Sequence, residues 1–223
     1  MWYQLSNDDY RGYIYNRLWA GLFNFKFEDT YRIGEQNQDT ADAIPRYYIY
    51  IGMAKLFENK YSEAADFFKK GIELAEVKKI KQPDMRFLHG FAQLKTGNFA
   101  EAEKYFETTV NFYDTLLINH PELKTPDHMY AITDRYWYFP YLILTCTWAA
   151  RGNKKKALEN MRLLQQNYKA NDLQVVTLLK YFPMLDNIRN EPEFQAYLKE
   201  AETHYNAEHK KVEKLLRQEG IIR

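Results

Sequence analysis

Five histidines and one cysteine are the side chains of this sequence best suited to metal binding or catalysis. Such chemistry needs a second ligand or an acid–base partner at a suitable spacing, as in the zinc and protease motifs. His204 and His209 are five residues apart, so on a helix they point away from each other. The other three histidines lie outside any such motif: His89, His120 and His128. We expect structural or surface roles for all five and no bound metal.

Motifs for nucleophilic or phosphate chemistry do not occur in the sequence. It contains no Gly-rich phosphate loop, no Gly-x-Ser-x-Gly elbow and no His-Glu-x-x-His. Cys146 lies in an apolar stretch with no histidine near it in the sequence, which favours a buried thiol. Carboxylates alternate with lysines at helical spacing, as on a solvated helix face. We therefore expect no enzyme activity and no cofactor, and an enzyme whose site is assembled from dispersed residues stays an alternative.

Composition narrows the class of protein further. The 223 residues carry 31 basic and 30 acidic side chains, so no strong net charge attracts the chain to nucleic acid or to an anionic membrane. No apolar stretch approaches the ~20 residues that span a bilayer. A single cysteine suits a reducing compartment. We expect a cytoplasmic protein, with a removed signal or a missing N-terminal domain as alternatives.

The elements that must position these residues are almost all helices, as apolar periodicity and breaking residues indicate. Helices are expected in five stretches: 10–36, 45–58, 61–78, 83–96 and 99–119. A further helix from Pro126 should bend near 137–141, because Pro140 falls inside it. Asn190 and Glu193 have the spacing of a capping box, and we expect one long helix from there to Gln218.

A short phrase occurs three times: NKYSEA at 59–64, TGNFAEA at 96–102 and RGNKKKA at 151–157. Each phrase separates two apolar helical stretches, which predicts the turn of a helical hairpin. The phrases align on three alanines: Ala64, Ala102 and Ala157. Twelve residues before them stand small residues: Gly52, Gly90 and Thr145. Four residues after them stand bulky ones, which are expected to interlock with the small residues: Phe68, Phe106 and Met161.

This pattern resembles the tetratricopeptide repeat (TPR), a helix–turn–helix unit of about 34 residues. The matching residues are Tyr48, Gly52, Tyr61, Ala64 and Phe68; Gly90, Phe99, Ala102 and Phe106; and Tyr141, Leu144, Trp148 and Ala157. The intervals between the three alanines are longer than this unit, and Lys154 stands where the family has an aromatic residue. The resemblance implies an all-α fold, a right-handed superhelix of about three TPR-like hairpins with a long C-terminal capping helix.

The expected organisation is one continuous domain with three parts: an N-terminal helical flank at 1–44, TPR-like repeats at 45–168 and capping helices at 169–223. The repeats are expected at 45–78, 83–119 and 126–168. The segment 181–202 resembles the end of many bacterial TPR arrays, which stand alone or follow a DNA-binding domain, a nucleotide cyclase or a kinase. The chain is expected to be a stand-alone protein or a piece of such a regulator.

In TPR proteins the first helix of each hairpin lines a ligand groove. The resemblance maps this groove to apolar residues: Ile49, Tyr50, Met53, Leu56, Phe57, Phe87, Phe91, Leu94, Leu142 and Cys146. One interpretation is that these residues are core. The other is a hydrophobic groove for an apolar protein or peptide segment, which gives a protein-binding scaffold. A regulatory segment that binds a small molecule in this aromatic groove is a further alternative.

The last predicted helix carries one apolar stripe, formed by Phe194, Leu198, Ala201, Tyr205, Val212 and Leu215. The stripe either packs on the array as a cap or pairs with a second copy in a homodimer. No nucleic-acid or membrane partner is expected.

Overall fold

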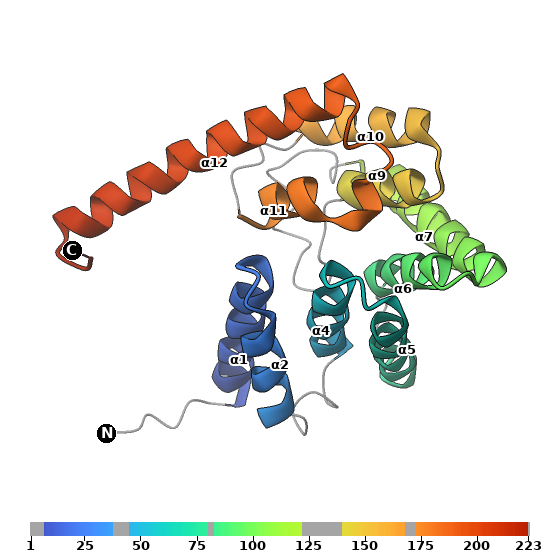
Figure 1. Cartoon of the computed structure of the whole chain (residues 1–223), viewed down its shortest axis with the longest axis horizontal. Coiled ribbons are helices and arrows are strands. Elements are labelled where there is room, and N and C mark those ends of the chain that lie inside the picture. Colours follow the sequence, from blue (N-terminus) through green and yellow to red (C-terminus); the bar gives the residue numbers. More distant parts are fainter. Residues whose placement is uncertain (1–6, 38–44, 80–82, 122–139, 168–172, 223) are drawn as a thin grey trace. The chain divides into compact units, whose positions relative to one another are not determined.

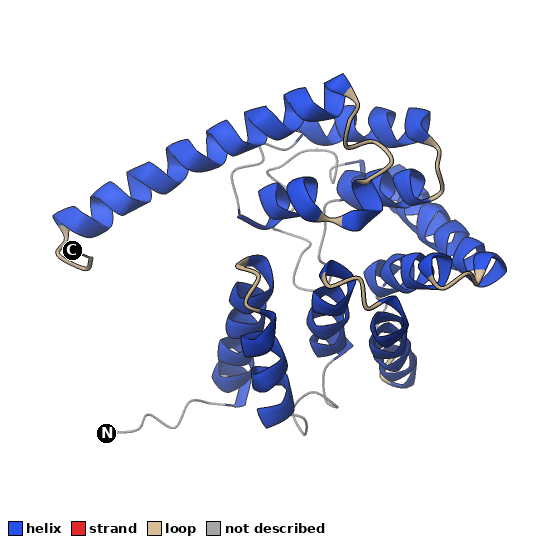
Figure 2. Ribbon diagram, viewed as in Figure 1, coloured by secondary structure: helices blue, strands red, loops and turns tan. Residues whose placement is uncertain are grey.

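The structure, a computed structural model, describes the following residues: 7–37, 45–79, 83–121, 140–167 and 173–222. Within these ranges the elements are ten α-helices and one short 3₁₀ helix, with no strand (Figure 2). This confirms the all-α class. The chain divides into two compact units, 1–112 and 113–223, and each is described by itself.

The first unit is built from paired helices (Figure 1). They are α1 (Asn7–Phe23), α2 (Phe27–Gln36), α4 (Pro45–Phe57), α5 (Tyr61–Val77), α6 (Pro83–Lys95) and the first part of α7 (Phe99–Asn119). Helix α1 packs on α2, and α4 packs on α5, which also contacts α6. The predicted bounds of the last four helices are confirmed to within one residue.

The second unit holds the end of α7 and five further elements. They are α9 (Pro140–Ala150), α10 (Lys154–Asn167), α11 (Leu173–Tyr181), the 3₁₀ helix η2 (Pro183–Leu185) and α12 (Pro192–Gln218). Helix α9 packs on α10 and η2, and α12 contacts α10 and α11. All residues of α9 except Trp148 are buried.

One prediction about a helix start is wrong, and another is not tested. Helix α9 spans Pro140–Ala150, and residues 122–139 before it lie outside the described residues, so the bend expected near 137–141 stays a prediction. At α12 the residue before the helix is Glu191, whose side chain forms no cap, and Glu193 pairs with Arg162 of α10 instead.

The same tight turn joins the two helices of four hairpins. One residue in each turn has a positive φ, and these residues are Phe25, Asn59, Gly97 and Gly152. The amide of the next residue donates to the carbonyl five positions back, as in Lys60 N to Lys55 O at 2.8 Å and Asn98 N to Gln93 O at 2.9 Å. This hydrogen bond is the helix-ending bond of a Schellman motif.

In each turn, the residue after the one with positive φ also starts the following helix. Its carbonyl accepts a hydrogen bond from the amide four positions later, and these acceptors are Lys26, Lys60, Asn98 and Asn153. The donors are Thr30, Ala64, Ala102 and Ala157. Three of these donors are the alanines on which the sequence phrases align, so the phrase marks the start of the second helix of each hairpin.

The pair α1–α2 is a fourth hairpin, which the sequence phrases did not identify. Its donor Thr30 precedes the donor Ala64 by 34 residues, and Phe25 precedes Asn59 by the same interval. The hydroxyl of Thr30 is buried with the side chain, where a Cβ on Gly21 would meet it. The N-terminal flank therefore repeats the backbone pattern of the later hairpins with different side chains.

Small residues allow two of these helix pairs to cross closely. A Cβ added to Gly52 would lie 2.5 Å from Cε1 of Phe68, whose ring is fully buried. At Gly90 it would lie 3.0 Å from Cβ of Tyr105 and 3.2 Å from Phe106. Overpacking of this kind destabilises a core, so the small residues are required by the packing.

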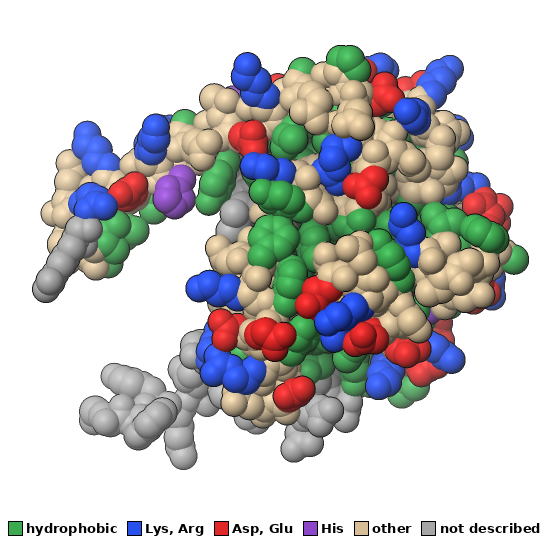
Figure 3. Space-filling model, in the orientation of Figure 1, with side chains coloured by type: hydrophobic (Ala, Val, Ile, Leu, Met, Phe, Trp, Pro, Cys, Tyr) green, Lys and Arg blue, Asp and Glu red, His purple; other side chains and the backbone are tan. Residues whose placement is uncertain are grey.

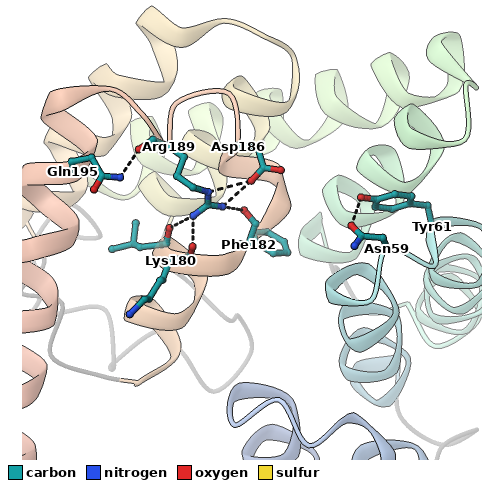
Figure 4. A network of polar contacts seen from close by, with 8 residues as sticks. Asn59, Tyr61, Lys180, Phe182, Asp186, Arg189 and Gln195 are labelled. Atoms are coloured by element: carbon teal, nitrogen blue, oxygen red, sulfur yellow. Dashed lines mark hydrogen bonds and ion pairs between the residues drawn. The ribbon is translucent and has the colours of Figure 1, made fainter.

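The side chain of one arginine, Arg189, caps the C-terminal end of α11 (Figure 4). The guanidinium of Arg189 donates to the carbonyls of Leu179, Lys180 and Phe182 and pairs with Asp186. The carbonyl of Arg189 accepts a hydrogen bond from Gln195 of α12 at 2.6 Å. The last carbonyls of a helix have no partner within it, and here one side chain satisfies two of them, those of Leu179 and Lys180.

We predict that Gly97→Val lowers the free energy of unfolding by roughly 1–2 kcal/mol. Gly97 has φ +87° and no atom near its added Cβ, so the effect comes from the backbone alone. Chemical denaturation measures it. The matched control is Gly97→Asn, because asparagine tolerates the left-handed region and stands at the equivalent position 59. Equal losses for both variants would contradict this role of the turn.

Candidate functional site

The residues of the expected groove are placed on the first helices of three hairpins, and most are buried. Eight are buried: Ile49, Tyr50, Met53, Leu56, Phe87, Phe91, Leu142 and Cys146. Phe57 and Leu94 are partly exposed, and Phe57 stacks against Phe27 of α2. This burial matches the interpretation of the stripe as core. That a partner reaches these side chains stays a prediction.

A polar pocket of about 300 Å³ opens on the first unit. Three helices line it: α5 with Lys69, Ile72, Glu73 and Glu76, α6 with His89 and Gln93, and α7 with Glu101 and Tyr105. Three carboxylates against one amine make the lining acidic. Arg86 offsets part of this charge, because its guanidinium lies 3.2 Å from Glu76.

His89 lies buried in the wall of this pocket. Its Nδ1 lies 3.0 Å from the carbonyl of Ala65 on α5, which can only accept, so Nδ1 carries the proton. Its Nε2 then accepts from the amide of Gln93 at 3.1 Å. The ring also meets Tyr105 edge-on, with centroids 4.7 Å apart. These contacts hold the neutral imidazole in one orientation.

Burial in this wall favours the neutral forms of His89 and Tyr105. Burial lowers the pKa of His89, and the hydrogen bond to Ala65 and the charge of Glu101 offset this only in part. Burial, with the negative charge of Glu101, raises the pKa of Tyr105. His89 thus contributes a fixed neutral ring at pH 7, while the exposed carboxylates supply the charge of the pocket.

Cys146, the one cysteine, is buried in α9. Burial raises the pKa of its thiol, and this outweighs the opposing positive charge of Arg189. The thiolate is the reactive form, so this cysteine is protected from nucleophilic and metal chemistry at neutral pH.

Metal-binding clusters and membrane-spanning helices are both absent from the described ranges. Among those residues no three His, Cys, Asp or Glu side chains are grouped closely enough to hold a metal ion. Among the same residues no helix is both long and apolar enough to span a bilayer.

The stripe on α12 divides into a covered and an open part. Phe194, Tyr197 and Ala201 are buried. Polar pairs tie the same stretch to α10 and α11, including Gln165 with Glu200 at 2.6 Å and Lys180 with Glu202 at 2.9 Å. We call residues 203–218 the distal half of α12. It carries Val212 and Leu215 with 52% and 56% of their surface exposed.

Sequence reasoning missed two of these features. The pocket over His89 brings together three helices, and the one local signal was the spacing of four residues between His89 and Gln93. Arg189 lies within the segment 181–202, and the sequence pattern assigns no role to its side chain. No protein-family model, curated protein or solved structure matches this chain.

We predict that His89 makes the protein less stable in mild acid. Its pKa is lower in the folded state than in the unfolded state, so the unfolded chain binds more protons between the two values. This contribution to stability is present above the unfolded value of about 6.5 and is lost as the pH falls toward the folded value.

Urea unfolding between pH 7.5 and pH 5 measures this effect. His89→Asn keeps a donor for the carbonyl of Ala65 and should flatten the pH dependence. The control His120→Gln changes an exposed histidine and should leave the dependence as in the parent protein. An unchanged slope in His89→Asn would contradict the role given to His89.

Proposed function

We propose that this chain is a non-catalytic protein-binding scaffold of the TPR type, either alone or as the interaction part of a larger bacterial regulator. The observation that carries the proposal is the recurrence of one hairpin turn in four helix pairs. The first two turns are separated by the TPR repeat length of about 34 residues. Stacked hairpins of this kind act through extended surfaces.

The partner is a protein or peptide segment with apolar side chains. Leu94 supports this choice, since it belongs to the expected groove and is partly exposed near the end of α6. The buried members of the groove would form the floor beneath such accessible residues. In this proposal the first helices of the hairpins carry the binding surface, and the second helices support them.

Capture from the native cell, followed by mass spectrometry, tests this proposal. Leu94→Asp places a charge on a first helix and should reduce recovery of the partner at least tenfold, because an apolar contact is replaced by an unpaired carboxylate. Lys70→Asp introduces the same residue on the exposed face of α5 and should leave recovery unchanged. Circular dichroism checks that both variants are folded. Equal recovery with Leu94→Asp would reject this surface.

A second candidate function follows from the pocket over His89, namely a regulatory segment that responds to a small ligand. The acidic lining favours a small cationic molecule, such as an organic amine, over an anion. A panel of amines in a thermal-shift assay tests this. Binding should be weakened by Glu101→Gln, which lines the pocket, and kept by Glu107→Gln, which is exposed elsewhere on α7.

A further inference from the structure

The distal half of α12 continues a face that the same helix uses for packing. Tyr205, Val212 and Leu215 follow Phe194 and Ala201 at intervals of three, four and seven residues, so all five lie on one side of the helix. After Glu202 the ion pairs of α12 are internal, as between Lys211 and Glu208 or Arg217 and Glu213. The stripe therefore extends beyond the residues that cover it.

The space-filling view shows the two sides of this segment. Hydrophobic side chains lie along its lower edge, and Lys and Arg gather mainly along the upper edge (Figure 3). Two more apolar residues follow the helix, Ile221 with 62% and Ile222 with 37% of their surface exposed. An amphipathic helix with an open apolar face of this length fits a second helix laid along it.

We propose that the distal half of α12 pairs with the same segment of a second copy, in antiparallel orientation about a two-fold axis that passes the apolar face at the level of residue 210. This register places Tyr205 level with Leu215 of the partner subunit. It also places Val212 level with Glu208 of the partner subunit. The two outer layers are then apolar, and each of the two central layers sets Val212 beside a glutamate, as in a short antiparallel coiled coil with a polar centre.

Glu208 decides the orientation. It stands three residues after Tyr205 and four before Val212, so it lies within the apolar stripe. A parallel pair would press two Glu208 carboxylates together in the interface, where like charges without water are strongly unfavourable. In the antiparallel pair Glu208 lies beside Lys211 of the partner subunit. The symmetry repeats this contact, which gives two ion pairs at the centre.

The open face of α12 starts where its packing within the chain ends. Leu198 is partly exposed at the point where α12 leaves α10 and α11, so the proposed interface continues along the same side of the helix. The surface belongs to α12 and does not depend on the proposed function.

Sedimentation of the full chain from ~1 to ~100 µM tests the pairing, a range in which weak dimers become populated. We expect the mass of two chains at the upper end. Val212→Glu with Leu215→Glu should give a monomer with unchanged helicity. The matched control, Lys210→Ala with Lys214→Ala, changes the charge equally on the opposite face and should stay dimeric.

Charge exchange tests the orientation. Glu208→Lys and Lys211→Glu should each raise the dissociation constant of the dimer at least tenfold. Mixing these two variants should restore association, because each copy then supplies the charge that the other lacks. A pair of ions within one helix cannot produce this rescue by mixing. In a parallel dimer Lys211 would face no Glu208, so Lys211→Glu alone would have little effect.

Several results would overturn the proposal. One is a native protein that stays monomeric over the whole concentration range. Another is a dimer that survives Val212→Glu with Leu215→Glu, and a third is failure of the mixed variants to associate. A monomer whose melting temperature falls with Val212→Glu and Leu215→Glu would show that the stripe packs on its own chain.

Discussion

The helical pairs of this protein depend on one residue that serves both helices of a hairpin. In the second hairpin this residue is Lys60, whose amide ends α4 and whose carbonyl starts α5. Only Glu58 and Asn59, the latter with φ +60°, separate it from the first helix. Because so few bonds can rotate between the helices, the direction of the second helix is set by the end of the first. Gly52 and Phe68 therefore meet at the crossing.

The later hairpins could be predicted from the sequence because their turns use residues typical of the left-handed conformation, such as Gly97 and Gly152. Helical sequence is also expected at 10–36, but the turn of the first hairpin lacks the phrase, since Phe25 occupies this position and Thr30 replaces the alanine. The turn is defined by backbone hydrogen bonds, and these tolerate unusual side chains when the helices hold them in place. The repeated sequence phrases therefore identify turns that use glycine or asparagine and miss a turn that uses phenylalanine.

The apolar periodicity of the sequence identified positions that are buried, but it did not show whether the chain itself or a partner covers them. A core and a hydrophobic groove use the same residue types at the same spacing, so Phe87 or Leu142 fits both until burial is known. The pocket over His89 is a different case. Its geometry comes from a carbonyl of Ala65 on another helix, 24 residues away, and no local pattern encodes such a contact.

The hydrogen bonds of Arg189 at the end of α11 also fix the start of α12. Arg189 is bonded to three carbonyls of the preceding segment, and its own carbonyl holds Gln195 in the first turn of α12. With 27 residues at 1.5 Å each, α12 is a rod of about 40 Å that is anchored near one end. The bond from Gln195 and the ion pair of Lys180 with Glu202 hold the first part of this rod, so the direction of the distal half is set by the packing of residues 192–202 on α10 and α11.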